Sequence, residues 1–237
     1  MVAVKHALRE WGARALDVVY PPDAIDVTGL RWIDAPCCAR CGLPFEVSLA
    51  GIGEASEFTC GACEARSPRY DRARAAFAYD DASRDLVLSF KHAGRTGNLG
   101  MFALQMLRAG REVLEGADAL VPVPLHRSRL RLRRFNQSAL LANRLAKLSG
   151  VEVAPNLLWR AKKTESQGTK SAVARRRNVA GAFRVRGMPP AHCVLVDDVM
   201  TTGATLEACA YALRRAGARR VDAVCLARVV RERAPES

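Results

Sequence analysis

One stretch near the C-terminus decides the fold of this chain: Val194-Leu195-Val196-Asp197-Asp198-Val199-Met200-Thr201-Thr202-Gly203-Ala204-Thr205-Leu206. The pattern predicts an apolar strand that ends in two acids, a loop of small and hydroxyl residues, and the start of a helix. A helix N-terminus offers unpaired N–H groups and the positive end of a dipole, which together favour a phosphate. Two adjacent carboxylates can accept hydrogen bonds from a vicinal diol such as the 2′- and 3′-hydroxyls of ribose. The stretch therefore predicts a ribose 5-phosphate site, with an ordinary helix cap as the alternative.

Strands and helices alternate on both sides of this stretch. The apolar pattern predicts strands at 74–79, 119–123, 192–196 and 221–227, and helices at 99–114, 136–148 and 203–215. Strands separated by helices of this length form βαβ units, so the chain is predicted to be an α/β protein with a mostly parallel sheet flanked by helices. Ligands bind at the carboxyl edge of such a sheet, which is where the two acids are expected.

Four cysteines form a pattern with the spacing of a metal site. Cys38-Ala-Arg-Cys41 and Cys60-Gly-Ala-Cys63 give C-x2-C-x18-C-x2-C, the spacing of a four-cysteine zinc ribbon. Two such knuckles complete a tetrahedral shell with no open position, so the predicted Zn²⁺ is structural. Cys37 could replace Cys38 as a ligand, although only Cys38 gives the two-residue spacing. A redox pair or unrelated thiols are the alternatives.

Composition restricts the class of protein. The chain has 237 residues and a net charge of +13, and no apolar run approaches the roughly 18 residues that a membrane span needs. The charged N-terminal segment does not resemble a secretory signal, so a cytoplasmic location is expected, where disulfides are rare. We expect Cys193, Cys209 and Cys225 to be small buried residues.

The excess of positive charge lies in one stretch. Residues 127–186 contain sixteen Lys and Arg against two acids, a net charge of +14, so the rest of the chain is close to neutral. Such an excess repels itself unless an anion lies nearby. A solvated basic face is the alternative to a bound anion.

The chain is predicted to have three parts. The apolar spacing at 4–20 indicates an amphipathic helix, which with its linker makes up residues 1–35. The cysteine-rich segment spans 36–70, and the α/β domain spans 71–237.

The thirteen-residue stretch resembles the phosphoribosyl-pyrophosphate (PRPP) motif of the type I phosphoribosyltransferases. Residues 36–230 are similar to the ComF/GntX family, which joins an N-terminal double zinc ribbon to a phosphoribosyltransferase domain. Besides the PRPP motif and the cysteine pairs, the resemblance rests on Phe90-Lys91-His92, Val121-Pro-Val-Pro-Leu-His126, Arg134-Phe-Asn-Gln137, and Gln167 with Arg177-Asn178. Many members have a glycine where this chain has Arg134.

The resemblance implies roles for particular residues. Acids that match Asp197 and Asp198 hold the ribose hydroxyls, and the loop that matches residues 201–205 wraps the 5-phosphate. Mg²⁺ usually arrives bridged to the pyrophosphate and ribose oxygens. By position, the resemblance puts the loop that binds the pyrophosphate at 123–127, and the basic segment 160–177 could close over the site as a hood. The candidates for these two parts are His126, Arg127, Lys91, Lys163, Gln167 and Arg177.

Two functions follow from the resemblance. One is a phosphoribosyltransferase that uses PRPP and Mg²⁺ and transfers phosphoribose to a base. The other is a non-catalytic protein that binds PRPP or a nucleotide, together with single-stranded DNA or proteins of the competence machinery, during DNA uptake. The aromatic residues that stacking on DNA needs are sparse in the basic stretch, with only Phe135, Trp159 and Phe183. The sequence leaves the acceptor base, turnover, direct DNA binding and the oligomeric state open.

Overall fold

The computed structural model describes residues 29–33, 36–45, 58–92, 97–162 and 172–230. The chain divides into two units, Met1–Leu30 and Arg31–Ser237, and the second unit contains nearly all of the described residues. The predicted helix at 4–20 lies outside the described residues. The predicted boundary between the cysteine-rich segment and the α/β domain stays a prediction.

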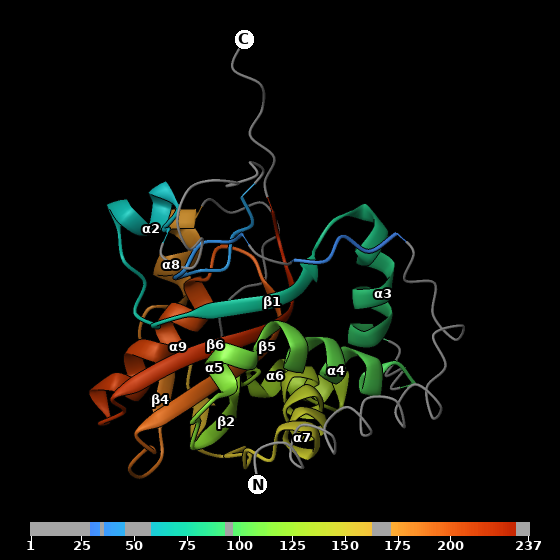
Figure 1. Cartoon of the computed structure of the whole chain (residues 1–237). Helices are drawn as coiled ribbons and strands as arrows, with labels where there is room; N and C mark the ends of the chain where they lie inside the picture. The colour runs from blue at the N-terminus through green and yellow to red at the C-terminus, as the bar shows by residue number, and fades with distance from the viewer. Residues whose placement is uncertain (1–28, 34–35, 46–57, 93–96, 163–171, 231–237) are drawn as a thin grey trace, which may run out of the picture. The chain divides into compact units, whose positions relative to one another are not determined.

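A four-stranded parallel sheet forms the centre of the second unit (Figure 1). Its strands are β1 (Ala73–Ala78), β2 (Ala119–Pro122), β5 (His192–Met200) and β6 (Arg220–Arg228), in the order β1-β6-β5-β2. The strand residues are almost all buried, which explains why these segments are nearly continuous apolar runs. The sheet confirms the predicted α/β class.

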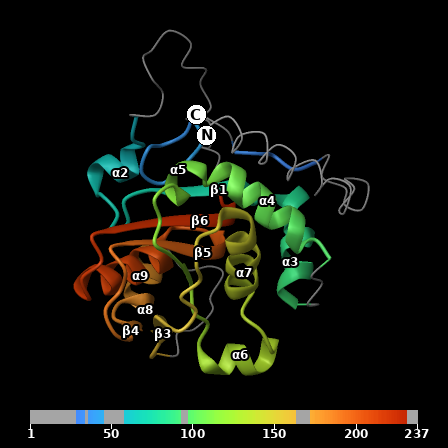
Figure 2. The ribbon, with the colours of Figure 1, turned by 60° about the horizontal axis from the view of Figure 1, so that its bottom comes forward.

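Helices cover the two faces of the sheet. Helices α4 (Leu99–Ala109) and α7 (Gln137–Ser149) pack on one another and on the strands, and α3 (Asp81–His92) meets α4 through the Phe90 and Phe102 rings. On the other face, α9 (Ala204–Arg215) packs on β5 and β6 and against α8 (Ala172–Val179). In Figure 2, α8 and α9 lie away from α4 and α7.

Three smaller helices and a two-stranded sheet complete the described part of this unit. Helix α2 spans Gly61–Ala65, α5 spans Arg111–Leu114 and α6 spans Arg127–Arg133. Strands β3 (Leu158–Arg160) and β4 (Phe183–Val185) form a separate antiparallel sheet, and α8 lies in the segment that connects them. The sequence pattern did not predict α3, α6, α8 or this small sheet. In the described ranges, no helix has the length and apolarity needed to cross a membrane.

Two predicted elements differ from the structure for physical reasons. The helix expected at 99–114 is interrupted at Gly110, where a Cβ atom would lie 2.8 Å from Val224 Cγ2 and from the Met106 carbonyl oxygen. A glycine is needed there because the helix end approaches β6 so closely. The strand expected to end at Val196 continues to Met200, because β6 stays paired with it as far as Arg228.

Candidate functional site

The loop between β5 and α9 lies at the carboxyl edge of the sheet. Gly203 is the N-cap of α9, has a φ of 74° and provides no side-chain cap for the first turn. The left-handed backbone favours glycine, and a Cβ atom at this position would lie 2.9 Å from Met200 Cε and 3.2 Å from the Tyr70 hydroxyl, so both side chains would have to shift. Thr202 Oγ1 is buried and has no hydrogen-bond partner among the described residues. An unused hydroxyl therefore lies beside a helix N-terminus that lacks a side-chain cap.

The two acids come directly before this loop, in the last part of β5. Asp197 Oδ1 accepts a hydrogen bond from the Asp198 amide at 2.9 Å, and Asp198 Oδ1 accepts one from the Val199 amide at 2.6 Å. Both side chains are partly exposed. The backbone therefore holds each carboxylate in a defined orientation at the edge of the sheet.

A residue that the sequence did not indicate also positions Asp197. Ser138, in the first turn of α7, is buried and donates from Oγ to Asp197 Oδ1 at 2.9 Å. The preceding residues explain how Ser138 is held: Asn136 caps α7 by accepting from the Ser138 amide at 3.1 Å. The Asn136 amide group also donates to the Val123 carbonyl at 3.1 Å. The Phe-Asn-Gln motif was therefore a usable signal, because it joins the loop after β2 to the acids of β5.

Arg134 lies at the turn where the resemblance leads one to expect glycine. It is the C-cap of α6 and has a φ of 64°, the only positive φ of a non-glycine residue in the described ranges. A left-handed conformation explains the preference for glycine there. Arg134 adopts this left-handed conformation although its Cβ atom makes it sterically unfavourable.

The predicted pyrophosphate loop, residues 123–127, runs from the end of β2 beside β5. The Val123 amide donates to the Val196 carbonyl at 2.9 Å, which keeps the start of the loop next to the acids. His126 is the N-cap of α6, and its Nδ1 atom accepts from the Ser128 amide at 3.2 Å. Arg127 is exposed. His126 therefore has a capping role that the sequence did not predict.

The predicted hood is described only in part. Lys163 and Gln167 lie outside the described residues, as does the side chain of Lys91, whose backbone belongs to α3. Arg177 is exposed on α8. At the other end of the hood, the Arg160 guanidinium lies 5.3 Å from the centre of the buried Phe183 ring. The described ends of the hood therefore come from α8 and from strand β3.

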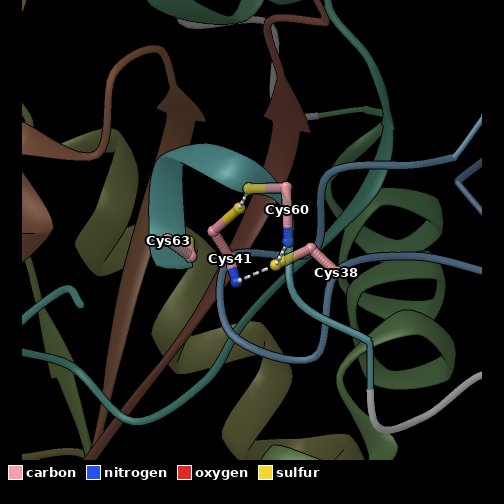
Figure 3. Close-up of side chains that lie close together, drawn as sticks. All are labelled: Cys38, Cys41, Cys60 and Cys63. Carbon is pink, nitrogen blue, oxygen red and sulfur yellow. Dashed lines mark hydrogen bonds between the residues drawn. The ribbon is translucent and has the colours of Figure 1, made fainter. Parts of the chain in front are cut away.

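The four predicted metal ligands come together in space (Figure 3). The sulfur atoms of Cys38, Cys41, Cys60 and Cys63 are buried and all lie within 4.8 Å of one another. Cys37 is not in this group; it pairs with Pro44 in an isolated β-bridge. The cluster therefore contains Cys38 and not the neighbouring Cys37.

The cluster has the dimensions of a zinc site. Four sulfurs at about 2.3 Å from a tetrahedral Zn²⁺ lie about 3.8 Å apart, and the Cys41 and Cys60 sulfurs are 3.7 Å apart. The amides of Cys41 and Cys60 point at the Cys38 sulfur, at 3.5 and 3.2 Å. These four donors fit Zn²⁺ as a structural ion.

Proton sharing within the cluster distinguishes the thiols. A hydrogen bond from the Cys41 thiol, aided by the backbone amides, lowers the pKa of Cys38 to about 4. The same shared hydrogen and burial raise the pKa of Cys41, and burial raises the pKa of Cys63 to about 12. Metal binding by thiols of this kind requires their deprotonation, so the affinity of such a cluster for a metal falls as the pH is lowered.

The remaining three cysteines are fully buried, as predicted. Burial raises the pKa of Cys193 to about 11 and raises those of Cys209 and Cys225 well above the usual value for a thiol. Such thiols are inert, small apolar residues.

Comparison with known proteins agrees with this geometry. Residues 138–237 match the family model of the phosphoribosyl transferase domain. DNA utilization protein YhgH of Escherichia coli K12 is 32% identical over 83% of this chain and 86% of its own. Competence protein F of Haemophilus influenzae is 29% identical over 81% and 85%, and competence protein ComFC of Bacillus subtilis is 26% identical over 86% and 83%. The chain therefore belongs to the ComF family of proteins, with a type I phosphoribosyltransferase fold and an N-terminal four-cysteine ribbon.

Proposed function

We propose that this chain binds the ribose 5-phosphate part of PRPP or of a nucleotide at the carboxyl edge of its sheet. The observation that carries the proposal is the buried Thr202 hydroxyl, which has no partner among the described residues and lies beside the uncapped N-terminus of α9. A buried hydroxyl without a partner costs free energy, and a phosphate oxygen would accept from it. The amides of the first turn of α9 add further donors.

The neighbouring residues supply the rest of the proposed site. Asp197 and Asp198 accept hydrogen bonds from the ribose hydroxyls, and the loop at 123–127 faces the pyrophosphate. Mg²⁺ prefers carboxylate and phosphate oxygens as ligands, so we expect it to bind together with PRPP. Departure of pyrophosphate from the anomeric carbon requires its charge to be neutralised, which we assign to the basic hood of residues 160–177.

Calorimetric titration with PRPP and Mg²⁺ tests the phosphate contact. Thr202→Val removes the hydroxyl at nearly constant volume, and Thr202→Ser keeps it. We expect the valine variant to bind roughly 10- to 100-fold more weakly, since a hydrogen bond to a charged group contributes about 1.5–3 kcal/mol. The serine variant serves as the matched control and should bind like the wild type. Equal affinity in the valine variant would contradict the proposal.

The names of the relatives indicate the biological process in which the chain acts. We propose that the chain acts in the cytoplasm in the handling of incoming DNA, as the names competence protein and DNA utilization protein suggest for its relatives.

Release of pyrophosphate from PRPP, measured with a panel of purine, pyrimidine and pyridine bases, tests whether the site catalyses transfer of phosphoribose to a base. Turnover that disappears in the Asp197→Asn, Asp198→Asn variant would identify a phosphoribosyltransferase; binding without turnover with any base would identify a non-catalytic binding protein.

One exposed aromatic residue favours single-stranded DNA as a second ligand. Trp159, on strand β3, is 37% exposed, and the Arg186 guanidinium lies 5.8 Å from the centre of its ring. An exposed ring flanked by arginine is the kind of surface on which unpaired bases stack. Of the other aromatics in the basic stretch, Phe183 is buried in the core and Phe135 is partly exposed.

The anisotropy of a labelled oligonucleotide, measured across salt concentrations, tests this second ligand. Trp159→Ala should weaken binding by about 1–3 kcal/mol, the range for one stacked base. Tyr211→Ala is a matched control, because Tyr211 is 45% exposed and also lies near arginines, but outside the basic stretch. Equal losses in the two variants, or no binding at low salt, would exclude the β3–β4 sheet as a DNA surface.

A further inference from the structure

Arg228 is a buried cation between the cysteine cluster and the loop before α9. It is the last residue of β6, pairs in register with Met200 of β5, and is only 7% exposed. A buried arginine is costly unless its charge and its donors are matched. The contacts of this guanidinium therefore indicate what it does.

On one side, the guanidinium contacts a metal-ligand candidate. Its Nη2 atom lies 3.4 Å from the Cys41 sulfur, and its Nη1 atom donates to the Cys41 carbonyl. A Zn²⁺ ion with four thiolates carries a net negative charge, which a buried cation stabilises. Arg74 also lies near the knuckle, but it donates to the Cys38 and Ala39 carbonyls, at 3.5 and 3.2 Å, and forms an ion pair with Glu112.

On the other side, Arg228 contacts the residue that supports the phosphate loop. Its Nη1 atom lies 3.3 Å from the Met200 sulfur, and the Val229 amide donates to the Met200 carbonyl at 2.9 Å. The Met200 methyl group in turn fills the space next to Gly203, together with the buried Tyr70 hydroxyl. The contacts therefore run from Cys41 through Arg228 and Met200 to the N-cap of α9.

We propose that Arg228 is a positioning residue that couples metal occupancy of the ribbon to phosphate binding by the loop. When the metal holds the two knuckles together, the Cys41 sulfur and carbonyl fix the guanidinium, which holds Met200 against Gly203. Loss of the ion releases the knuckles from one another, because the shared metal is what joins their four sulfurs. The effect on the loop rests on the phosphate site proposed above, whereas the effect on the metal does not.

The test measures zinc and PRPP separately on the full chain. The proteins are the wild type, Arg228→Met, Arg228→Lys, and the control Arg215→Met, which removes an equal charge from an exposed position on α9. Zinc affinity is obtained by competition with a chromophoric chelator. PRPP affinity is obtained by calorimetry on zinc-loaded and zinc-depleted protein. Hydrogen exchange of residues 200–205 reports on the loop without any ligand.

Coupling predicts a specific pattern. In Arg228→Met, zinc affinity falls about tenfold or more, as for other residues that contact metal ligands, and Arg228→Lys recovers part of it. For the wild type and Arg215→Met, the zinc-depleted form binds PRPP about tenfold more weakly than the zinc-loaded form. For Arg228→Met, the affinities of the two forms differ much less. Exchange in residues 200–205 becomes faster on depletion of the wild type.

Two results would overturn the proposal. One is unchanged zinc affinity in Arg228→Met. The other is identical loop exchange in zinc-loaded and zinc-depleted wild type. If the zinc-loaded wild type binds no PRPP while both of these readouts behave as predicted, the proposed function fails and the link from Arg228 to the loop stands. Should Arg228→Met not fold, the lysine variant and the depletion of wild type provide the same two readouts.

Discussion

Replacing Ser138 by alanine removes the hydroxyl that donates to Asp197 Oδ1 over 2.9 Å. Ser138 is 3% exposed, and a hydrogen bond to a charged group contributes about 1.5–3 kcal/mol. Asp197 keeps the bond from the Asp198 amide and is itself partly exposed, so we expect the lower end of this range. The free energy of unfolding should fall by about 1.5 kcal/mol, and PRPP should bind about tenfold more weakly because the carboxylate loses its orientation.

Urea denaturation and calorimetry with PRPP and Mg²⁺ measure the two effects. Ser138→Cys is the matched control for packing, since a thiol has nearly the same size but is a weak donor; it should resemble the alanine variant. In a double-mutant cycle, Ser138→Ala should cost less in the Asp197→Asn background than in the wild type. Equal costs in both backgrounds, or no change in PRPP affinity, would refute the assignment of Ser138 as a positioning residue.

Three further predictions concern the turn after α6, the N-cap of α9 and the metal site. Arg134→Gly should raise the free energy of unfolding by about 0.5–1 kcal/mol in urea, because it relieves a left-handed non-glycine residue; a loss of stability would contradict this. Gly203→Ala should lower the melting temperature, since its Cβ atom meets Met200 Cε at 2.9 Å in a left-handed conformation; an unchanged melting temperature would show that the site is not crowded. Elemental analysis should find no bound zinc in Cys38→Ser and one zinc ion per chain in Cys37→Ser. The reverse result would show that Cys37, and not Cys38, is the ligand.

The sequence was most informative where one local pattern has one structural solution. The apolar runs at β1, β2, β5 and β6 predicted the strands, and their alternation with helices predicted the parallel sheet. The spacing of the cysteine pairs predicted the cluster, because two knuckles bring four sulfurs to one point. Both predictions depend on residues close together in the chain.

What the sequence did not indicate depends on residues far apart in the chain. Ser138 and Asp197 are 59 positions apart, and Arg228 and Cys41 are 187 apart. No period or spacing links such pairs. Helix α8 also gave no signal, because its sequence, Ala172-Val-Ala-Arg-Arg-Arg-Asn-Val179, has no apolar stripe with helical spacing.

The central claim is that the carboxyl edge of the sheet holds a ribose 5-phosphate. The most direct measurement is calorimetric titration of zinc-loaded wild type and of the Asp197→Asn, Asp198→Asn variant with PRPP and Mg²⁺. We predict saturable binding of one PRPP per chain by the wild type, and loss of that binding in a variant that keeps its zinc and its melting transition. Absence of saturable binding by the wild type, or undiminished binding by the variant, would contradict the claim.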